Sequence, residues 1–219
     1  AVNVEWDIRF PKEHRKLGLK VLTPSEQRRI MDFLSQHMSY RNLGIYICLS
    51  TGMRIGEICA LKWSDINVKE RIISVQRTIE RIYITDDDCR HTEVIVGPPK
   101  TVNSIREIPI SMQLIKVLRP IMKIVHADGY VLTNDTKPLE PRLYRNYYNN
   151  MIRNHNLPYI NFHGLRHSFA TRCIESRCDY KTVSMILGHA NITTTMNLYV
   201  HPGNDQKRKC IDKMMRMLC

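Results

Sequence analysis

The spacing of apolar residues changes its period twice along the chain, from helical to extended and back. From residue 24 onward, apolar side chains such as Ile30 and Leu34 recur at the intervals of a helix with one buried face. Thr23, Pro24 and Glu26 have the order of an N-cap, a first helical residue and the acidic partner of a capping box. The pattern therefore predicts a helix that begins directly after Thr23.

The helical period returns in several other segments. Gly52 and Gly188 follow two of them, as expected for left-handed residues that end helices. Pro120 predicts a break in the helical segment that follows Ser111. The remaining predicted helices cover 41–50, 55–63, 141–156, about 163–176, 180–187, 192–199 and about 205–217.

Between about 68 and 110, β-branched residues replace the helical period, in the stretches RIISVQRTIERIYI, EVIVG and IREIPI. The polar stretch TDDDCRH is predicted to be a hairpin tip rather than strand. PPKTVNS is predicted to be a second turn, which places Lys100 where two strands reverse. We therefore expect an α+β protein that is mainly helical, with a small antiparallel sheet of about three strands.

The charge of the chain narrows the class of partner. Lys and Arg number 33 against 21 Asp and Glu, for a net charge of +12. Such an excess favours a polyanion, because neutralising phosphates releases condensed counterions. An anionic membrane surface would also attract this charge, but no segment approaches the roughly 18 continuous apolar residues of a membrane span. The stretch AVNVEWDIRFPKEHRK also lacks the apolar core of a secretory signal.

The cysteines indicate a reducing compartment. The chain has 7 of them, an odd number without a pairing pattern. Scattered cysteines of this kind are typical of reduced thiols rather than of a disulfide scaffold. We expect a cytoplasmic protein.

The stretch HGLRHSFATR concentrates basic side chains on one predicted helix. His163 and Arg166 share a face, because residues three apart on a helix are neighbours, and His167 lies near the same line. Guanidiniums grip phosphate oxygens, imidazoles move protons, a lysine can act as a general acid, and a tyrosine can be a nucleophile. The candidate phosphate-handling residues are Arg54, Lys100, His163, Arg166, His189 and Tyr199.

Each of these residues also has an ordinary structural interpretation. An isolated arginine is usually solvated, and Tyr199 alone would most often be a half-buried aromatic. His163 and His167 could instead bind zinc, but the sequence offers neither the glutamate of an HExxH motif nor a third ligand in register. We therefore predict no metal site and assign His167 a structural role beneath the arginine-bearing helix.

Several motifs, in this order, resemble the catalytic domain of a tyrosine recombinase of the phage-integrase family. They are TGMRIGEICALKWSDI, PPKTVNSIREIPI, HGLRHSFAT and ILGHANITTTMNLY, and together with the first predicted helix they span about residues 23–200. All six candidate polar positions are filled. The residues of these motifs are most similar to those of integrases of mobile elements.

The resemblance implies roles for the polar residues. Tyr199 would attack a scissile phosphate and form a 3′-phosphotyrosyl bond, which frees a 5′-hydroxyl. Arg54 and Arg166 would hold the non-bridging oxygens, and Lys100 would protonate the leaving 5′-oxygen. Strand exchange would then proceed through a Holliday junction. No metal or other cofactor would be needed, because the covalent intermediate keeps the phosphodiester energy for religation.

The remaining implied roles concern protons and support. His163 would accept or orient the tyrosine proton, His189 would hydrogen-bond the phosphate, and Glu57 would brace Arg54. Arg142 and Arg145 open a helix that family members lay against the DNA, so both are candidate DNA-binding residues.

The resemblance also implies partners and a domain organisation. We expect residues 1–20 to be a linker or the tail of a missing N-terminal core-binding domain, and 21–219 to be the catalytic domain. The helix over 205–217 would dock on a neighbouring subunit through the apolar stripe formed by Ile211, Met214, Met215 and Leu218. The partners would be double-stranded recombination sites, a homo-tetramer on DNA and an accessory DNA-bending protein, and the bound enzyme would associate with the bacterial nucleoid.

Three alternatives remain open from the sequence. A type IB topoisomerase shares the tyrosine chemistry but relaxes supercoils as a monomer. A DNA-binding module without catalysis would keep the basic charge but not need the six polar residues. A zinc-dependent hydrolase would lose its activity in the presence of a chelator.

Overall fold

The computed structural model describes residues 20–86, 89–99, 101–189 and 191, together with 208, 211–212 and 214–216. Its α-helices are α1 (Pro24–Gln36), α2 (Tyr40–Thr51), α3 (Ile55–Cys59), α4 (Met112–Ile121), α5 (Pro141–Asn154), α6 (Phe162–Glu175) and α7 (Tyr180–Leu187). Its strands are β1 (Ile66–Asn67), β2 (Ile72–Val75), β3 (Thr78–Asp86), β4 (Cys89–Gly97) and β5 (Arg106–Pro109), and short 3₁₀ turns cover Trp63–Asp65 and Val102–Ser104.

Capping residues define the helix ends that the sequence predicted. The Thr23 hydroxyl accepts a hydrogen bond from the Glu26 backbone N–H, and the Glu26 carboxylate accepts one from the Thr23 N–H, which completes the capping box of α1. Helices α2 and α7 end at Gly52 and Gly188, whose φ angles of 70° and 65° are left-handed. Helix α4 ends one residue after Pro120, so the predicted break is also confirmed.

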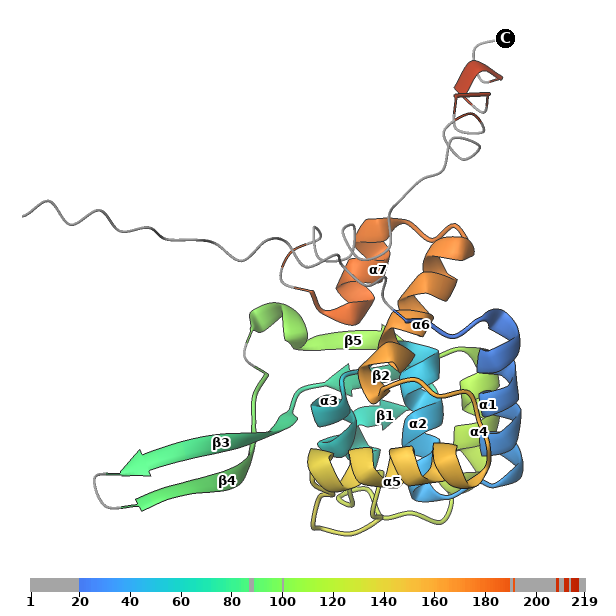
Figure 1. Ribbon diagram of the computed structural model, residues 1–219. Helices are drawn as coiled ribbons and strands as arrows, with labels where there is room; N and C mark the ends of the chain where they lie inside the picture. Colours follow the sequence, from blue (N-terminus) through green and yellow to red (C-terminus); the bar gives the residue numbers. More distant parts are fainter. Residues whose placement is uncertain are drawn as a thin grey trace, which may run out of the picture.

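The core is built around α2, which is buried on most of its surface. Leu43, Ile45 and Ile47 are fully buried in this helix. In Figure 1, α5 crosses the lower end of α2, α1 and α4 lie on its other side, and the small sheet lies beside it. Tyr144 and Tyr148 of α5 are fully buried, and each hydroxyl donates to a backbone carbonyl, which satisfies the polar end of each ring.

Helices α6 and α7 lie at one end of this core. Their contact forms a small separate apolar cluster of Ala170, Val183 and Leu187. Helix α6 therefore joins two packing units, because its first half contributes Phe162 and Leu165 to the main core. Figure 1 shows α7 above β5, with α6 beside α7.

The strands form two sheets rather than the single sheet that we predicted. β1, β2 and β5 pair antiparallel in the order β1-β2-β5, and β3 pairs only with β4. The predicted strand RIISVQRTIERIYI divides at Gln76 and Arg77, where the Arg77 guanidinium forms an ion pair with Asp65. The α+β class is confirmed, and the three-stranded sheet is one of two.

The β3–β4 hairpin corrects two further predictions. Its strands continue to Asp86 and start again at Cys89, so the ends of TDDDCRH are strand and not tip. Polar residues are tolerated there because the hairpin projects from the body (Figure 1), where β-pairing does not require an apolar face. PPKTVNS does not reverse two strands of one sheet, since β4 does not pair with β5; it connects the hairpin to the three-stranded sheet.

Several predictions fall outside the described residues. These include Lys100, the predicted helix over 192–199 with Tyr199, residues 1–19 and Leu218. Of the predicted C-terminal helix, Arg208, Ile211, Asp212, Met214 and Met215 have helical backbone.

Candidate active site

Arg54 lies at the junction between α2 and α3, where Gly52 turns the chain. It is the N-cap residue of α3, and its backbone N–H donates to Glu57 Oε2 at 2.8 Å. Its side chain, which is 36% exposed, donates from Nη1 to Glu57 Oε1 at 2.8 Å. The expected contact between Glu57 and Arg54 is therefore present, through both the backbone and the side chain.

Arg166 reaches the same junction from α6. It is 3% exposed, and its guanidinium donates from Nη1 to the Gly52 carbonyl and from Nη2 to the Leu187 carbonyl, each at 2.8 Å. Each terminal nitrogen also carries a second hydrogen that these two bonds do not use. Burial, followed by the charge of Arg54, lowers the pKa of Arg166 to about 9, so it remains protonated at neutral pH.

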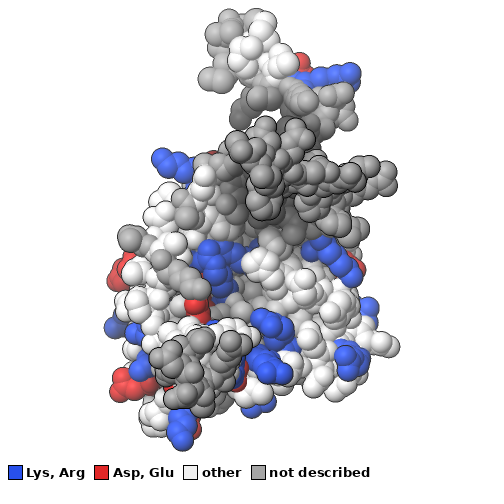
Figure 2. Space-filling view, turned by 60° about the vertical axis from the view of Figure 1, so that its left-hand side comes forward, with Lys and Arg blue, Asp and Glu red and all other residues white. Residues whose placement is uncertain are grey.

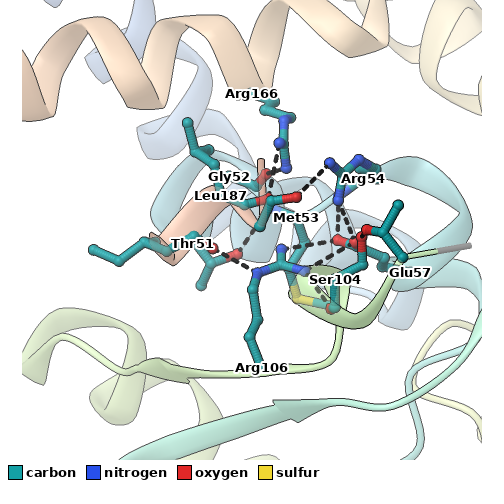
Figure 3. Close-up of polar contacts among 12 residues, drawn as sticks. Thr51, Gly52, Met53, Arg54, Glu57, Ser104, Arg106, Arg166 and Leu187 are labelled. Atoms are coloured by element: carbon teal, nitrogen blue, oxygen red, sulfur yellow. Dashed lines mark hydrogen bonds and ion pairs between the residues drawn. The ribbon is translucent and has the colours of Figure 1, made fainter. Parts of the chain in front are cut away.

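A third arginine, Arg106 at the start of β5, approaches the site from the opposite side. Its side chain is 7% exposed and grips the Glu57 carboxylate by two bonds, from Nη1 to Oε1 at 2.9 Å and from Nη2 to Oε2 at 3.0 Å. Glu57 thus lies between the guanidiniums of Arg54 and Arg106 (Figure 3). Burial opposes the charge of Glu57, but the bonds and charge of Arg106 and then of Arg54 outweigh it and lower the pKa of this carboxyl.

The three arginines converge on the last turn of α7. They donate in sequence to three consecutive carbonyls: Arg106 to Ile186 at 2.6 Å, Arg166 to Leu187 at 2.8 Å and Arg54 to Gly188 at 2.9 Å. Carbonyls at a helix C-terminus have no partner within the helix and carry a partial negative charge. The end of α7 therefore helps to accommodate three buried or half-buried cations beside a single carboxylate.

Histidines surround the arginines from α6 and from the residue after Gly188. The rings of His163 and His167 meet edge to face, with centroids 4.4 Å apart. Partial burial, then the charges of Arg166 and Arg54, lower the pKa of His163. Burial and nearby charge lower the pKa of both His167 and His189 to about 4, so both rings are neutral at neutral pH and each keeps one N–H.

A cavity of about 460 Å³ opens over this group. It is lined by Met53, Arg54, Ile55, Arg145, Asn149, Tyr159, Asn161, Phe162, His163 and Arg166. Three predicted site residues, Arg54, His163 and Arg166, therefore share one opening with Arg145 of α5. Arg142 is exposed on the same helix but does not line the cavity. Figure 2 shows one face of the molecule, on which lysine and arginine side chains gather in several groups.

Sequence reasoning did not single out Arg106. It belongs to the motif PPKTVNSIREIPI, but its partner Glu57 lies 49 positions earlier and its partner Ile186 lies 80 positions later. The only signal available in the sequence was a charged residue at the start of an apolar strand. Its importance depends on how β5, α3 and α7 meet.

Two kinds of feature are absent from the described part of the chain. Among those residues, no group of three or more His, Cys, Asp or Glu side chains is placed to hold a metal ion. Within the same residues, no helix is both long and apolar enough to cross a bilayer.

Comparison with known proteins identifies the class of protein to which this chain belongs. The phage integrase family model matches residues 20–206, and the chain belongs to this family. Over 221 residues it is 30% identical to a tyrosine recombinase XerC-like protein of Caldanaerobacter subterraneus subsp. tengcongensis. The alignment covers 93% of this chain and 56% of that protein. It is 27% identical to the transposase from transposon Tn916 of Enterococcus faecalis, over 84% of this chain and 48% of that one.

A solved structure has the same fold. The integrase of the Tn1549 transposon, in complex with transposon right end DNA, superimposes with a TM-score of 0.74 at 23% identity, over 93% of this chain and 68% of that chain. The predicted family and fold are thus confirmed, and the transposon relatives agree with the predicted mobile-element branch. The chain spans about half the length of the curated relatives it matches.

Proposed function

We propose that this chain is the catalytic domain of a site-specific DNA recombinase that cleaves and rejoins DNA through Tyr199. The supporting observation is the convergence of Arg54, Arg166 and His163 on one cavity, with His189 beside the same arginines. In the reaction, the Tyr199 oxygen attacks a scissile phosphate, a 3′-phosphotyrosyl bond forms, and the bond to the 5′-oxygen breaks. Attack by a 5′-hydroxyl of the partner strand reverses these steps and completes the exchange.

The arginines suit a phosphate better than any neutral ligand. Arg54 and Arg166 each have bonds to fixed acceptors and spare N–H groups, so they offer preorganised donors. Together with Arg106 they place three positive charges beside the single negative charge of Glu57. This surplus matches the negative charge that accumulates on the phosphate oxygens in the transition state.

The histidines and Lys100 carry the proton transfers in this proposal. His163 is neutral at neutral pH, because its pKa is lowered, and it can accept or orient the Tyr199 proton. His189 is neutral for the same reason and donates a hydrogen bond to the phosphate. Lys100 protonates the leaving 5′-oxygen. His167 packs against His163 and supports its ring.

The DNA is held by distributed positive charge. The net charge of +12 supplies attraction over the whole domain, and Arg145 extends the phosphate site along α5. Arg142 contributes a weaker contact from the exposed face of the same helix. The recombination sites are double-stranded DNA, and an accessory protein that bends DNA assists assembly.

The active assembly is a homo-tetramer in which the C-terminal helix over 205–217 docks on a neighbouring subunit. Its described apolar side chains Ile211, Met214 and Met215 are 60%, 49% and 48% exposed, which supports an intermolecular role. Residues 1–20 connect the catalytic domain to a core-binding domain. The named relatives favour strand exchange over supercoil relaxation and over DNA binding without catalysis.

Covalent trapping tests this function. The chain would be incubated, with EDTA present, with nicked duplexes whose sequence is randomised around the nick, so that the cleaved strand end diffuses away. We expect a denaturation-resistant protein–DNA complex that is absent from Tyr199→Phe, and sequencing of the trapped DNA would show an enriched site. The Tyr159→Phe variant, in which an exposed tyrosine at the cavity edge loses its hydroxyl, is the matched control and should retain the complex.

Two results would contradict the proposal. A covalent complex that persists in Tyr199→Phe would assign the nucleophile to another residue. Salt-dependent DNA binding without any covalent complex, in this chain and in an otherwise identical protein carrying a core-binding domain, would indicate a DNA-binding role alone.

A further inference from the structure

Arg106 makes more fixed contacts than Arg54 or Arg166, two of the arginines that line the cavity. Its Nη1 and Nη2 grip both oxygens of Glu57, its Nε donates to the Ile186 carbonyl, and its Nη1 also donates to the Ser104 carbonyl at 2.9 Å. One guanidinium thus joins β5 and the preceding turn to α3 and to the end of α7. Arg106 does not line the cavity, so it does not reach a ligand there directly.

The partners of Arg106 also support the phosphate-binding groups proposed above. Glu57 also holds Arg54, and Ile186 lies two residues before Gly188, whose carbonyl accepts from Arg54. His189 follows immediately. A displacement of the Arg106 side chain would therefore move Arg54 in two ways: through the Glu57 carboxylate, which both arginines bind, and through the last turn of α7, to which both donate.

The packing around Arg106 leaves it little freedom. A Cβ atom on Gly188 would lie 2.9 Å from the Asn103 carbonyl oxygen and 3.0 Å from Arg106 Cδ and Nη1. The backbone at the end of α7 therefore approaches the arginine stem as closely as a glycine allows. This close contact with Gly188 restricts the movement of the Arg106 side chain. The hydrogen bonds to Glu57 and Ile186 fix the orientation of the guanidinium plane.

We propose that Arg106 is a positioning residue for DNA cleavage, which aligns Arg54 and His189 by holding Glu57 and the end of α7 in one geometry. The proposal rests on the function proposed above. It assigns to Arg106 an effect on the cleavage rate without a direct contact to DNA. A planar guanidinium is needed for this role, because a lysine ammonium offers neither the fork for a carboxylate nor a separate Nε donor.

The first experiment compares Arg106→Lys and Arg106→Gln with the parent chain. Single-turnover cleavage of the trapped site would be measured at saturating protein, with DNA affinity measured separately. We expect the cleavage rate to fall by about 10- to 100-fold in both variants, because small misplacements of catalytic groups have effects of this size. DNA affinity should change by no more than a few-fold.

Arg71→Lys provides the matched control. Arg71 precedes β2 and donates to the Ile110 carbonyl, whereas Arg106 pairs with Val75 at the other end of the β2–β5 ladder. Both arginines brace the same two strands, but only Arg106 contacts Glu57 and α7. Arg71→Lys should retain the parent cleavage rate even where its thermal stability falls.

A double-mutant cycle separates positioning from a general loss of stability. If Arg106 acts through Glu57, the effects of Arg106→Gln and Glu57→Gln on the cleavage rate should be strongly non-additive. In addition, the acid limb of the rate profile should move to higher pH in Arg106→Gln, since the remaining burial raises the pKa of Glu57 once its main partner is removed.

Three outcomes would overturn the inference: a cleavage rate in Arg106→Lys equal to that of the parent, additive effects in the cycle, or a loss of DNA affinity as large as the loss of cleavage. A side-chain NMR measurement keeps this test independent of the proposed function. The Nε–H resonance of Arg54 should shift in Arg106→Lys but not in Arg71→Lys, whether or not Tyr199 forms a covalent complex.

Discussion

Two sets of arginines on this domain differ in how they are held. Arg166 and Arg106 are 3% and 7% exposed and have their guanidiniums bonded to backbone carbonyls or to Glu57. Arg142 and Arg145 are exposed on α5. Fixed donors define a geometry, and exposed donors contribute mainly charge. Arg106 and Arg166, the buried set, are therefore suited to fixing the geometry of the cleavage site. Arg142 and Arg145, the α5 set, are suited to attracting DNA and raising the affinity for it.

The largest expected effect comes from changing the buried set. Arg166→Lys keeps a positive charge but loses the fork between the Gly52 and Leu187 carbonyls. We expect the single-turnover cleavage rate to fall by about 10²–10³-fold, as for the loss of a preorganised donor in other active sites. DNA affinity, measured by anisotropy, should change little.

Arg145→Lys is the control for that substitution, because it makes the same chemical change on α5. It should cleave at close to the parent rate. Equal losses in Arg166→Lys and Arg145→Lys would remove the distinction between the two sets.

A smaller but still substantial effect is expected from Gly188→Ala. The φ angle of Gly188 is 65°, and a Cβ there would lie 2.9 Å from the Asn103 carbonyl oxygen. A left-handed non-glycine residue costs about 1 kcal/mol or more, and the close contact adds to this, so the melting temperature and the cleavage rate should both fall. Gly97→Ala is the control, since a Cβ at Gly97 would meet nothing within 4 Å. Equal stability of the two variants would show that the end of α7 is free to move.

The third expected effect is a pH dependence of stability that arises at His167, which follows Arg166 on α6. The pKa of His167 is about 4 in the folded chain and near 6.5 when unfolded, so the unfolded state binds the extra proton between these values. Stability from this residue is complete above pH 6.5 and is lost as the pH falls toward 4. The slope is at most about 1.4 kcal/mol per pH unit.

Urea unfolding at several pH values measures this slope. His167→Gln should flatten it between pH 4 and 6.5, whereas His126→Gln, at an exposed histidine, should not. An unchanged slope in His167→Gln would mean that burial, with the charges of His163 and Arg166, does not keep this ring neutral.

The smallest effects are expected from α5. Arg145→Ala should weaken DNA binding a few-fold at all sequences and reduce the slope of log K against log salt by about 1, because one phosphate contact is lost. Arg142→Ala should have a smaller effect, since Arg142 does not line the cavity. Titrations at two salt concentrations measure both. A larger loss in Arg142→Ala than in Arg145→Ala would reverse their assigned importance.

Local chemistry explains which features were predictable from the sequence. Thr23, Gly52 and Gly188 mark helix ends through their own side chains or backbone freedom, so their positions were correct. The contact between Arg54 and Glu57 spans one helical turn and was also expected. These features depend on neighbours in the chain.

The features that were missed depend on distant contacts. The division of the predicted strand at Arg77 follows from its pairing with Asp65, and β5 joins β2 instead of β4. The role of Arg106 requires α3 and α7 to meet above β5, and neither helix signals this in its own pattern. Lys100 and Tyr199 lie outside the described residues, so their placement stays a prediction.

The attachment of α7 to the body has a thermodynamic consequence. Its last turn is held by three arginines that repel one another, and Glu57 neutralises only one of them. A bound anion would relieve this repulsion, so folding and anion binding are linked through mass action. The domain should be least stable in dilute buffer and gain stability as inorganic phosphate or sulfate is added. DNA would then act as a structural ligand of the domain before any bond is broken.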